Sequence, residues 1–360
     1  MKKTQQGKAS VLFWNPPLIL AAASVVGKKE GEGPLGAFFD QVEQDPMFGK
    51  KTWEQAESEL QHRATSLAIE KSGLKKEEIR YYFGGDLLAQ LIATSFGVVD
   101  QNIPMFGIYG ACSTMGEAMG LASMVVDGEF ADHVIVTVSS HFASAEKQFR
   151  FPLEYGNQRP LSASWTVTGC GSVILSKQDA ESGKNHKPDT LGSKKPLAKV
   201  AGMTTGKIVD MQVKDSMNMG AAMALAALDT ILTNFRDLQV DETYYDRIIT
   251  GDLGQIGKRI LLDYLAKVGY DIESRYMDCG IEIFDEASQD THAGGSGCGC
   301  SASVLCAYIL PKLQVGEWKR VLFVPTGALL STVSFNEGQS VPGIAHGVIL
   351  EHIETQLNSK

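Results

Sequence analysis

The sequence is short of positive charge and of long apolar runs. Lys and Arg number 33 against 42 Asp and Glu, which gives a formal net charge of −9. This balance argues against nucleic acid as the main partner and against direct adhesion to an acidic lipid surface. The longest early apolar run, residues 16–26, contains two prolines and reaches only about half of a membrane span. We therefore expect no transmembrane segment, and no secretory signal peptide because residues 1–7 lack an apolar stretch.

Cysteine is scarce as well. The chain has six cysteines, and their spacing is not that of a secreted disulfide framework. Free thiols in a reducing compartment are therefore expected. Cys298 and Cys300 are separated by one residue, whereas zinc motifs place about two to four residues between paired cysteines. We predict no structural zinc and no other metal held by the protein alone.

A cysteine at a turn is the most informative feature that the sequence does contain. Cys112 lies between an apolar strand expected over residues 103–109 and a helix expected over residues 113–126. The N-terminus of a helix carries unpaired N–H groups and about half a positive charge. That position lowers the pKa of a cysteine and so favours a nucleophile, but it also holds a carboxylate without any chemistry. A buried cysteine that only fills space is the third interpretation.

The chain contains an internal sequence repeat. Residues 80–90 resemble residues 247–255, and residues 128–136 resemble residues 316–324 in the same order. In each half a strand, a Gly-Asp turn and a helix precede a helix, a Gly-Glu turn and a strand. Because strand and helix signals alternate throughout, this order predicts a duplicated α/β protein.

The internal repeat predicts that the chain consists of two halves. We expect an N-terminal half over residues 1–180 and a C-terminal half over residues 196–360. The segment between them, residues 178–196, is polar and rich in Lys, Gly and Ser, which is typical of a linker. Residues 27–50 show no clear period and are expected to form a loop or an arm.

Asp86 and Asp252 occupy equivalent turns in the two halves. Aspartate is among the best residues for capping a helix, so capping alone would account for both. A role in a site is equally compatible with their position. Beside an anionic ligand such a carboxylate needs a proton or a cation between the two charges, and Ca²⁺ prefers oxygen ligands.

Five motifs together resemble the thiolase superfamily and, within it, the family of stage V sporulation protein AD of endospore formers. The resemblance covers nearly the whole chain. It implies a thiolase-like, duplicated five-layer αβαβα fold and a homodimer. The motifs are Trp14-Asn15-Pro16-Pro17, Gly84-Gly85-Asp86-Leu87-Leu88, Tyr109-Gly110-Ala111-Cys112-Ser113-Thr114-Met115, Thr250-Gly251-Asp252-Leu253-Gly254 and Pro325-Thr326-Gly327-Ala328-Leu329-Leu330-Ser331.

The same resemblance implies a function. It points to non-catalytic binding of dipicolinic acid (pyridine-2,6-dicarboxylic acid), with or without Ca²⁺, and to a part in its uptake into the developing spore. The implied partners are integral membrane proteins of the same transport assembly. The implied location is peripheral, on the inner membrane of the spore or forespore. No cofactor is implied apart from calcium that accompanies the ligand.

The alternative is an acyl-condensing enzyme of the thiolase or ketoacyl-synthase type that uses Cys112 as nucleophile. Such chemistry needs basic groups, usually histidines, to activate the thiol and to stabilise the oxyanion. The second-half turn that should carry one such histidine instead carries Asp252. An ionised carboxylate facing the thiol would raise the pKa of the thiol. The sequence therefore argues against turnover.

The predicted site gathers around Cys112. Thr166 is expected to donate a hydrogen bond to a ligand carboxylate, and Trp165 either stacks on a planar ring or belongs to the core. The sequence has only seven histidines, of which His141 follows an expected strand and His292 lies in a glycine-rich loop ahead of a second-half helix. The expected neighbours of Cys112 are Asp86, Thr166, His141, Asp252 and His292.

Overall fold

Ten strands, each paired with the next, form the central sheet of the molecule, and this series is called the ten-strand path below. The computed structural model describes residues 4–150, 158–178 and 195–354. Three short strands join the path at its sides, namely β1 (Gln5–Gln6), β2 (Ser10–Leu12) and β4 (Gln41–Glu43). The order along the path is β12 (Tyr276–Asp278), β11 (Arg247–Thr250), β14 (Arg320–Val324), β17 (Gly347–Glu351), β10 (Ala198–Thr204), β3 (Leu18–Gly27), β9 (Gly169–Ser176), β7 (His133–Ser140), β5 (Tyr81–Gly85) and β6 (Met105–Gly107).

The path consists of two copies of one pairing pattern. In the N-terminal copy, β3 pairs antiparallel with β9, β9 antiparallel with β7, and β7, β5 and β6 run parallel. In the C-terminal copy, β10, β17, β14, β11 and β12 repeat this sequence of two antiparallel and two parallel pairings. A short antiparallel contact between β10 and β3 joins the copies. The internal repeat in the sequence thus corresponds to a repeat in the sheet topology.

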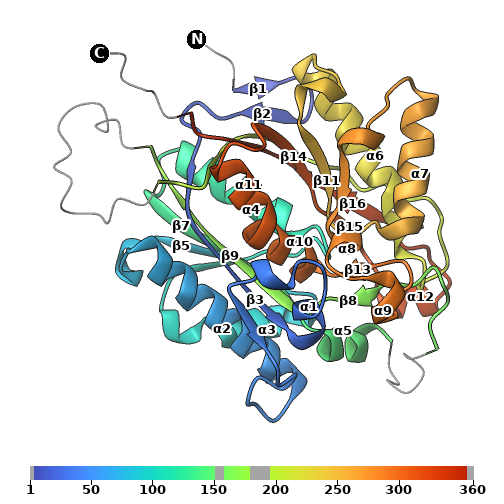
Figure 1. Ribbon diagram of the computed structural model, residues 1–360, viewed down its shortest axis with the longest axis horizontal. Helices are drawn as coiled ribbons and strands as arrows, with labels where there is room; N and C mark the ends of the chain where they lie inside the picture. The colour runs from blue at the N-terminus through green and yellow to red at the C-terminus, as the bar shows by residue number, and fades with distance from the viewer. Residues whose placement is uncertain (1–3, 151–157, 179–194, 355–360) are drawn as a thin grey trace.

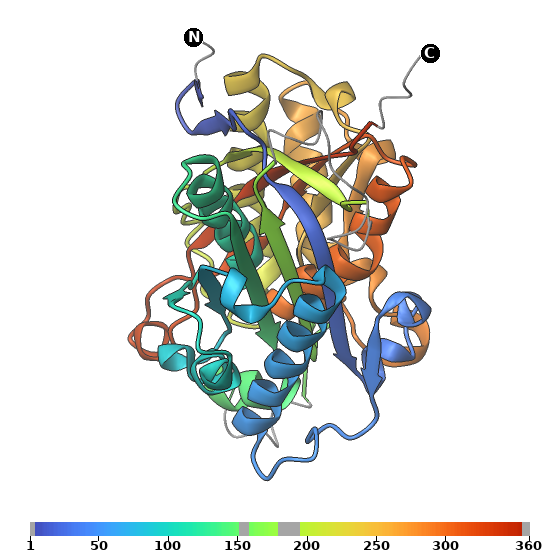
Figure 2. The same cartoon turned by 90° about the vertical axis from the view of Figure 1, so that its left-hand side faces the viewer.

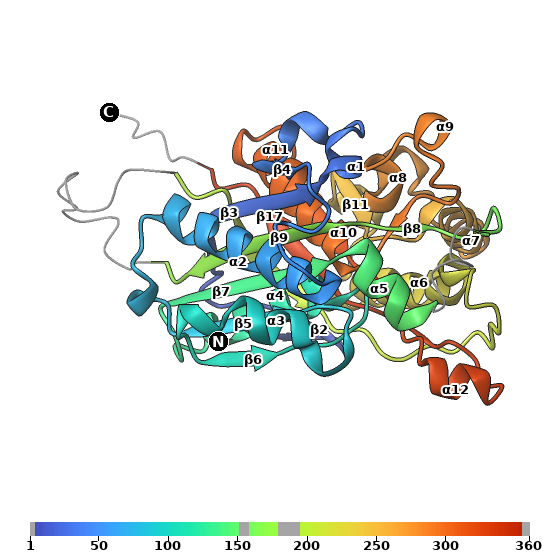
Figure 3. The same ribbon diagram turned by 90° about the horizontal axis from the view of Figure 1, so that it is seen from below.

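The two copies of the pattern are called the N-terminal and the C-terminal sheet. Helices lie between these two sheets and on the outer side of each, which gives three helical layers (Figures 1 and 3). The middle layer contains α4 (Thr114–Asp127) and α10 (Cys298–Val304), which contact strands of the sheets from inside. Helix α2 (Trp53–Ser72) covers the outer face of the N-terminal sheet together with α3 (Ile92–Gly97), as Figure 2 shows for the blue helix α2. Helices α6 (Met219–Leu238) and α7 (Gly254–Lys267) cover the C-terminal sheet. The order is therefore α, β, α, β, α.

The remaining elements are short. Two small ladders lie outside the main path, β8 (Trp165–Thr166) with β13 (Gly295–Ser296) and β15 (Thr326–Ala328) with β16 (Gly343–Ala345). The other α-helices are α1 (Lys28–Gly31), α5 (Phe142–Phe149), α8 (Cys279–Glu282), α9 (Glu286–Gln289), α11 (Leu310–Gln314) and α12 (Thr332–Asn336). Within the described ranges, no helix is long and apolar enough to cross a membrane.

The structure corrects one expectation and leaves another open. Residues 27–50 are not a plain loop, because they contain α1 and the strand β4, which pairs in parallel with β3. Most of the predicted linker, residues 179–194, lies outside the described residues. The predicted boundaries of the two halves remain a prediction.

Strand β6 is an exposed, apolar edge of the sheet. Its three residues are exposed, and Met105 and Phe106 keep 39% and 48% of their surface accessible. An unpaired strand edge with apolar side chains is a surface on which another chain can pair. The homodimer expected from the resemblance remains a prediction, and this edge is available for it.

Candidate functional site

The turn that carries Cys112 is held by its own neighbours. The hydroxyl of Thr114 donates a hydrogen bond to the Ala111 carbonyl (2.6 Å) and accepts one from the Gly110 N–H (3.1 Å). Ala111 takes a left-handed backbone conformation with φ of 49°, which is strained for a residue with a Cβ. The tight turn places Cys112 directly before α4, as the strand–turn–helix pattern predicted.

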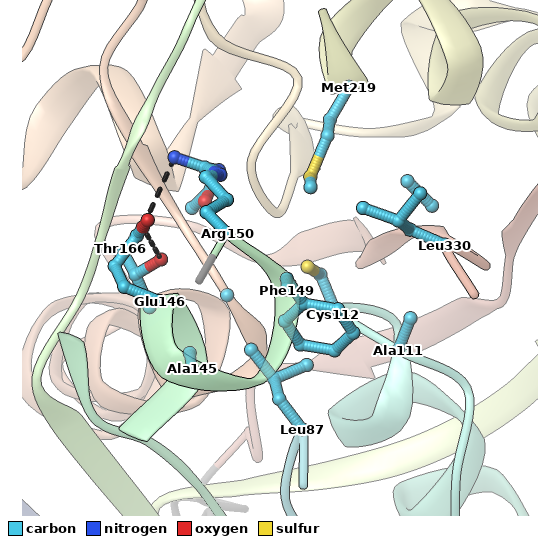
Figure 4. Close-up of a pocket in the computed structure, with 13 residues that line it drawn as sticks. Leu87, Ala111, Cys112, Ala145, Glu146, Phe149, Arg150, Thr166, Met219 and Leu330 are labelled. Atoms are coloured by element: carbon cyan, nitrogen blue, oxygen red, sulfur yellow. Dashed lines mark hydrogen bonds and ion pairs between the residues drawn. The ribbon is translucent and has the colours of Figure 1, made fainter. Parts of the chain in front are cut away.

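A small cavity of about 30 Å³ lies in front of the Cys112 sulfur, enough for about two water molecules. Figure 4 shows Glu146 and Arg150 on one side of this cavity and the sulfur facing it. The walls come from seven parts of the chain: Leu87 after β5, the turn before α4, the helix α5 with Arg150, the start of α6, and residues of or next to β8, β13 and β15. Both halves therefore contribute to the cavity.

Asp252 lies against the thiol. It is 2% exposed, and its two carboxylate oxygens accept hydrogen bonds from the Gly297 N–H and the Thr326 hydroxyl, each at 2.9 Å. The Cys112 thiol lies close enough to this carboxylate for the two groups to shift each other's pKa. Burial and the nearby Asp252 raise the pKa of Cys112 well above its usual value, and burial raises the pKa of Asp252 to about 7. The thiol is thus stabilised in its protonated form, against the effect of the helix end.

The two candidate histidines do not reach Cys112, contrary to expectation. His141 caps α5: its Nδ1 accepts from the Ala143 N–H (3.2 Å), and its Nε2 lies 2.8 Å from the Pro46 carbonyl. His292 lies in a loop, with its Nδ1 2.9 Å from the Pro160 carbonyl. No described histidine lines the cavity. The position of a histidine along the chain does not determine the direction of its ring.

Asp86 also lies outside the cavity walls. Its Oδ1 accepts from the Leu88 N–H (2.7 Å), and its Oδ2 accepts from the Thr94 N–H (2.8 Å) and hydroxyl (2.6 Å). Asp86 is not the N-cap residue of α3, but its carboxylate binds Thr94 in the first turn of that helix, so its role in the structure is close to the capping interpretation. Like those of Asp252, its oxygens already serve protein donors, so neither aspartate fits a calcium ion held by the protein. The described residues contain no cluster of three or more acidic, histidine or cysteine side chains that could hold a metal.

Thr166 lines the cavity, as expected. It is 4% exposed, and its hydroxyl donates to Glu146 Oε1 at 3.2 Å. Its neighbour Trp165 belongs to an adjoining cleft instead, where its ring stacks on Phe142 at 4.1 Å between centroids. The Lys29 ammonium lies 4.3 Å from the same ring. Trp165 is therefore already occupied as a stacking partner.

Arg150 and Glu146 are two charged cavity residues that the sequence did not reveal. Arg150 ends α5, and its side chain is 9% exposed. Its Nη1 lies 3.1 Å from Glu146 Oε1, yet Nη1 and Nε have no hydrogen-bond partner among the residues that the structure describes. The only signal in the sequence was their spacing of four residues on a short helix, which normally indicates a solvated surface pair. The cavity thus holds a buried guanidinium with unused donors.

A family model of stage V sporulation protein AD matches residues 7–351. The chain belongs to the stage V sporulation protein AD family. It is 39% identical over 345 residues to stage V sporulation protein AD of Bacillus subtilis (strain 168), which covers 96% of this chain and 97% of that protein. The sequence-based assignment to this family is confirmed.

Solved structures of condensing enzymes share the fold. Human mitochondrial 3-ketoacyl-CoA thiolase aligns with a TM-score of 0.58 at 12% identity, over 94% of this chain and 99% of that one. The 3-oxoacyl-[acyl-carrier-protein] synthase III of Aquifex aeolicus VF5 aligns with a TM-score of 0.54 at 11% identity, over 93% and 99%. At these identities the likeness concerns the fold alone, and it confirms the thiolase-like architecture expected for this family member.

A larger cleft adjoins the cavity in this member of the family. Its volume is about 560 Å³, and its walls include Lys29, Trp53, His141 and Trp165. Among the residues that line the two spaces, Glu146 is the one that both share. The side chain of Glu146 therefore borders both the Cys112 cavity and the cleft.

The environment of the thiol predicts slow alkylation. At pH 8, Cys112 should react slowly with iodoacetamide, and Asp252→Asn should speed the reaction at least about tenfold, because one pKa unit changes the thiolate fraction tenfold. Mass spectrometry of the Cys112 peptide over time measures both rates. Asp86→Asn, which changes the equivalent aspartate outside the cavity, is the matched control and should leave the rate unchanged. Rapid alkylation of the unaltered chain would contradict the assignment.

Proposed function

We propose that the Cys112 cavity binds the dianion of dipicolinic acid and does not turn it over. The observation that carries this proposal is the buried Arg150 guanidinium beside the cavity, whose Nε and Nη1 lack hydrogen-bond partners within the described part of the chain. Arginine binds carboxylates strongly because its donors form a planar fork. The N-terminal end of α4 at Cys112 offers a second favourable place for negative charge.

The absence of turnover is supported by the partner of the thiol. A condensing enzyme needs a group that removes the thiol proton, but here the Asp252 carboxylate lies beside the thiol and raises the pKa of the thiol. The described histidines lie away from the cavity walls. Membership of a sporulation family supports a role in the developing spore, and we propose uptake of the ligand through membrane partners as that role.

The size of the cavity sets a condition on binding. A volume of about 30 Å³ holds about two waters, so a six-membered ring with two carboxylates enters only if side chains move. Phe149, at the end of α5, and Glu146, which also lines the adjoining cleft, are side chains of the wall whose movement would make room. Since Asp86 and Asp252 offer no unused oxygen, we propose that calcium arrives only as part of the ligand.

Titration calorimetry with dipicolinate, with and without Ca²⁺, tests the proposal. Saturable binding is expected, and Cys112→Trp should weaken it at least tenfold by filling the cavity. Cys112→Ser keeps the volume and should retain binding within about threefold, because no covalent chemistry is proposed. Absence of binding by the unaltered chain under both conditions would refute the proposal.

The same preparation tests the enzymatic alternative. Incubation with a series of acyl-CoA thioesters, followed by intact-mass measurement, should give no acyl adduct on Cys112. An adduct that disappears in Cys112→Ser would establish the thiol as a nucleophile. In that case the condensing-enzyme interpretation would replace ligand binding.

A further inference from the structure

A carboxylate of the protein already sits where a ligand carboxylate would bind. Glu146 Oε1 lies 3.1 Å from Arg150 Nη1 and accepts a hydrogen bond from the Thr166 hydroxyl at 3.2 Å. Its other oxygen, Oε2, is buried and has no hydrogen-bond partner in residues 4–150, 158–178 and 195–354. Glu146 therefore uses the two groups of the cavity wall best suited to a carboxylate, while leaving half of its own hydrogen-bonding capacity unused.

We propose that Glu146 is an internal competitor, which a carboxylate of the ligand displaces from Arg150 and Thr166. This inference rests on the proposed function, since it assigns a residue that controls the affinity of that same site. Displacement has a physical basis. One carboxylate of the ligand can accept a hydrogen bond from Nη1, which Glu146 meets only as an ion pair, and another acceptor of the ligand can satisfy Nε. The exchange thus completes hydrogen bonds that the unliganded site lacks.

The displaced side chain has a space to enter. Glu146 lines both the small cavity and the adjoining cleft of about 560 Å³. A rotation of its side chain toward the cleft would release Arg150 without moving α5. The large cleft thus accounts for how a cavity with room for about two waters admits a larger ligand.

The exchange requires a proton. Burial already raises the pKa of Glu146, and Arg150 is the strongest influence that lowers it. Once the ligand takes Arg150, Glu146 loses that cation in a buried position and binds a proton from solvent. Ligand binding should therefore take up protons and weaken as the pH rises, by up to tenfold per pH unit for one proton.

Other charged groups around Glu146 can also take up or release protons when the ligand binds. Asp252, across the cavity, has a pKa raised by burial to about 7 and titrates in the same range. Any uptake that persists after Glu146 is replaced is assigned to it. The titratable or charged groups that face Glu146 from its own helix, the cavity, the cleft and α2 are Arg150, Arg159, Cys112, Asp252, Lys29, Glu30, His141 and Glu57.

Calorimetry of dipicolinate binding between pH 6 and 8.5 tests the inference. At each pH, phosphate and Tris buffers, which differ in ionisation enthalpy, give the number of protons taken up. The unaltered chain should take up close to one proton per ligand near pH 7.5. Glu146→Gln should bind at least tenfold more tightly at pH 8 and lose most of the uptake and of the pH dependence.

The control and the second variant keep the test decisive. Glu351→Gln breaks a different partly buried glutamate–arginine pair, with Arg320 at 2.6 Å, and should behave like the unaltered chain. Glu146→Asp withdraws the carboxylate by one methylene and should also bind more tightly, which covers a failure of Glu146→Gln to fold. Weaker binding by both variants, or an unchanged proton uptake, would overturn the inference. Absence of binding by every chain would instead refute the proposed function.

Discussion

Replacing Arg150 with methionine should lower the affinity for dipicolinate at least about a hundredfold. Loss of one partner of a buried, hydrogen-bonded charge pair costs about 2–5 kcal/mol, and a hundredfold change in affinity corresponds to about 2.7 kcal/mol. Methionine keeps an unbranched apolar stem, so the walls of the cavity should stay packed. Titration calorimetry at pH 7 measures the effect, and a thermal melt checks that the variant is folded.

Two further variants show whether the loss is specific. Arg259, exposed on α7, is the matched control, and Arg259→Met should bind like the unaltered chain. Arg150→Lys keeps the charge but loses the planar fork, so an intermediate loss is expected. Binding by Arg150→Met at full affinity would show that the guanidinium does not hold the ligand, and the proposed site would be wrong.

The features predicted correctly from the sequence are those fixed by local chemistry. The apolar strand, the small residues of the turn and the helix behind Cys112 lie within one short stretch, so their arrangement follows from the order of the residues. The second-half turn with Asp252 is equally local. Its approach to the thiol was expected from the resemblance to the thiolase superfamily, in which the matching second-half turn carries a basic group near the reacting thiol.

The features that were missed depend on packing between distant segments. Helix α5 has eight residues, too few for a pattern of apolar positions to show which side faces inward. Glu146 and Arg150 face inward because α5 packs against Thr166. Thr166 is too far along the chain for a local sequence pattern to reveal this contact. His141 illustrates the same limit, because its ring turns to Pro46, far away along the chain.

Introducing a methyl group at Gly171 should strongly destabilise the fold. Gly171 lies on the central strand β9, and a Cβ there would meet the carbonyl oxygen of Ala302 at 2.2 Å and its carbonyl carbon at 2.4 Å. Ala302 belongs to α10, so the clash separates a helix of one half from the sheet of the other. Overpacking a core costs about 1–3 kcal/mol and sometimes more. We expect Gly171→Ala to lose at least about 3 kcal/mol, because the contact is with backbone that cannot rotate away.

Urea unfolding measures this loss, and a second strand glycine provides the control. Alanine should otherwise be favoured over glycine in a strand by about 0.5–1 kcal/mol. At Gly107, on the exposed β6, the added Cβ meets only the end of the Leu91 side chain, at 2.8 Å. Gly107→Ala should therefore cost little, and an equal cost at both positions would contradict the steric explanation. The substitution at Gly171 should also affect the Cys112 cavity, because Gly297 directly precedes α10 and its N–H donates a hydrogen bond to Asp252. A displaced α10 should therefore also weaken dipicolinate binding.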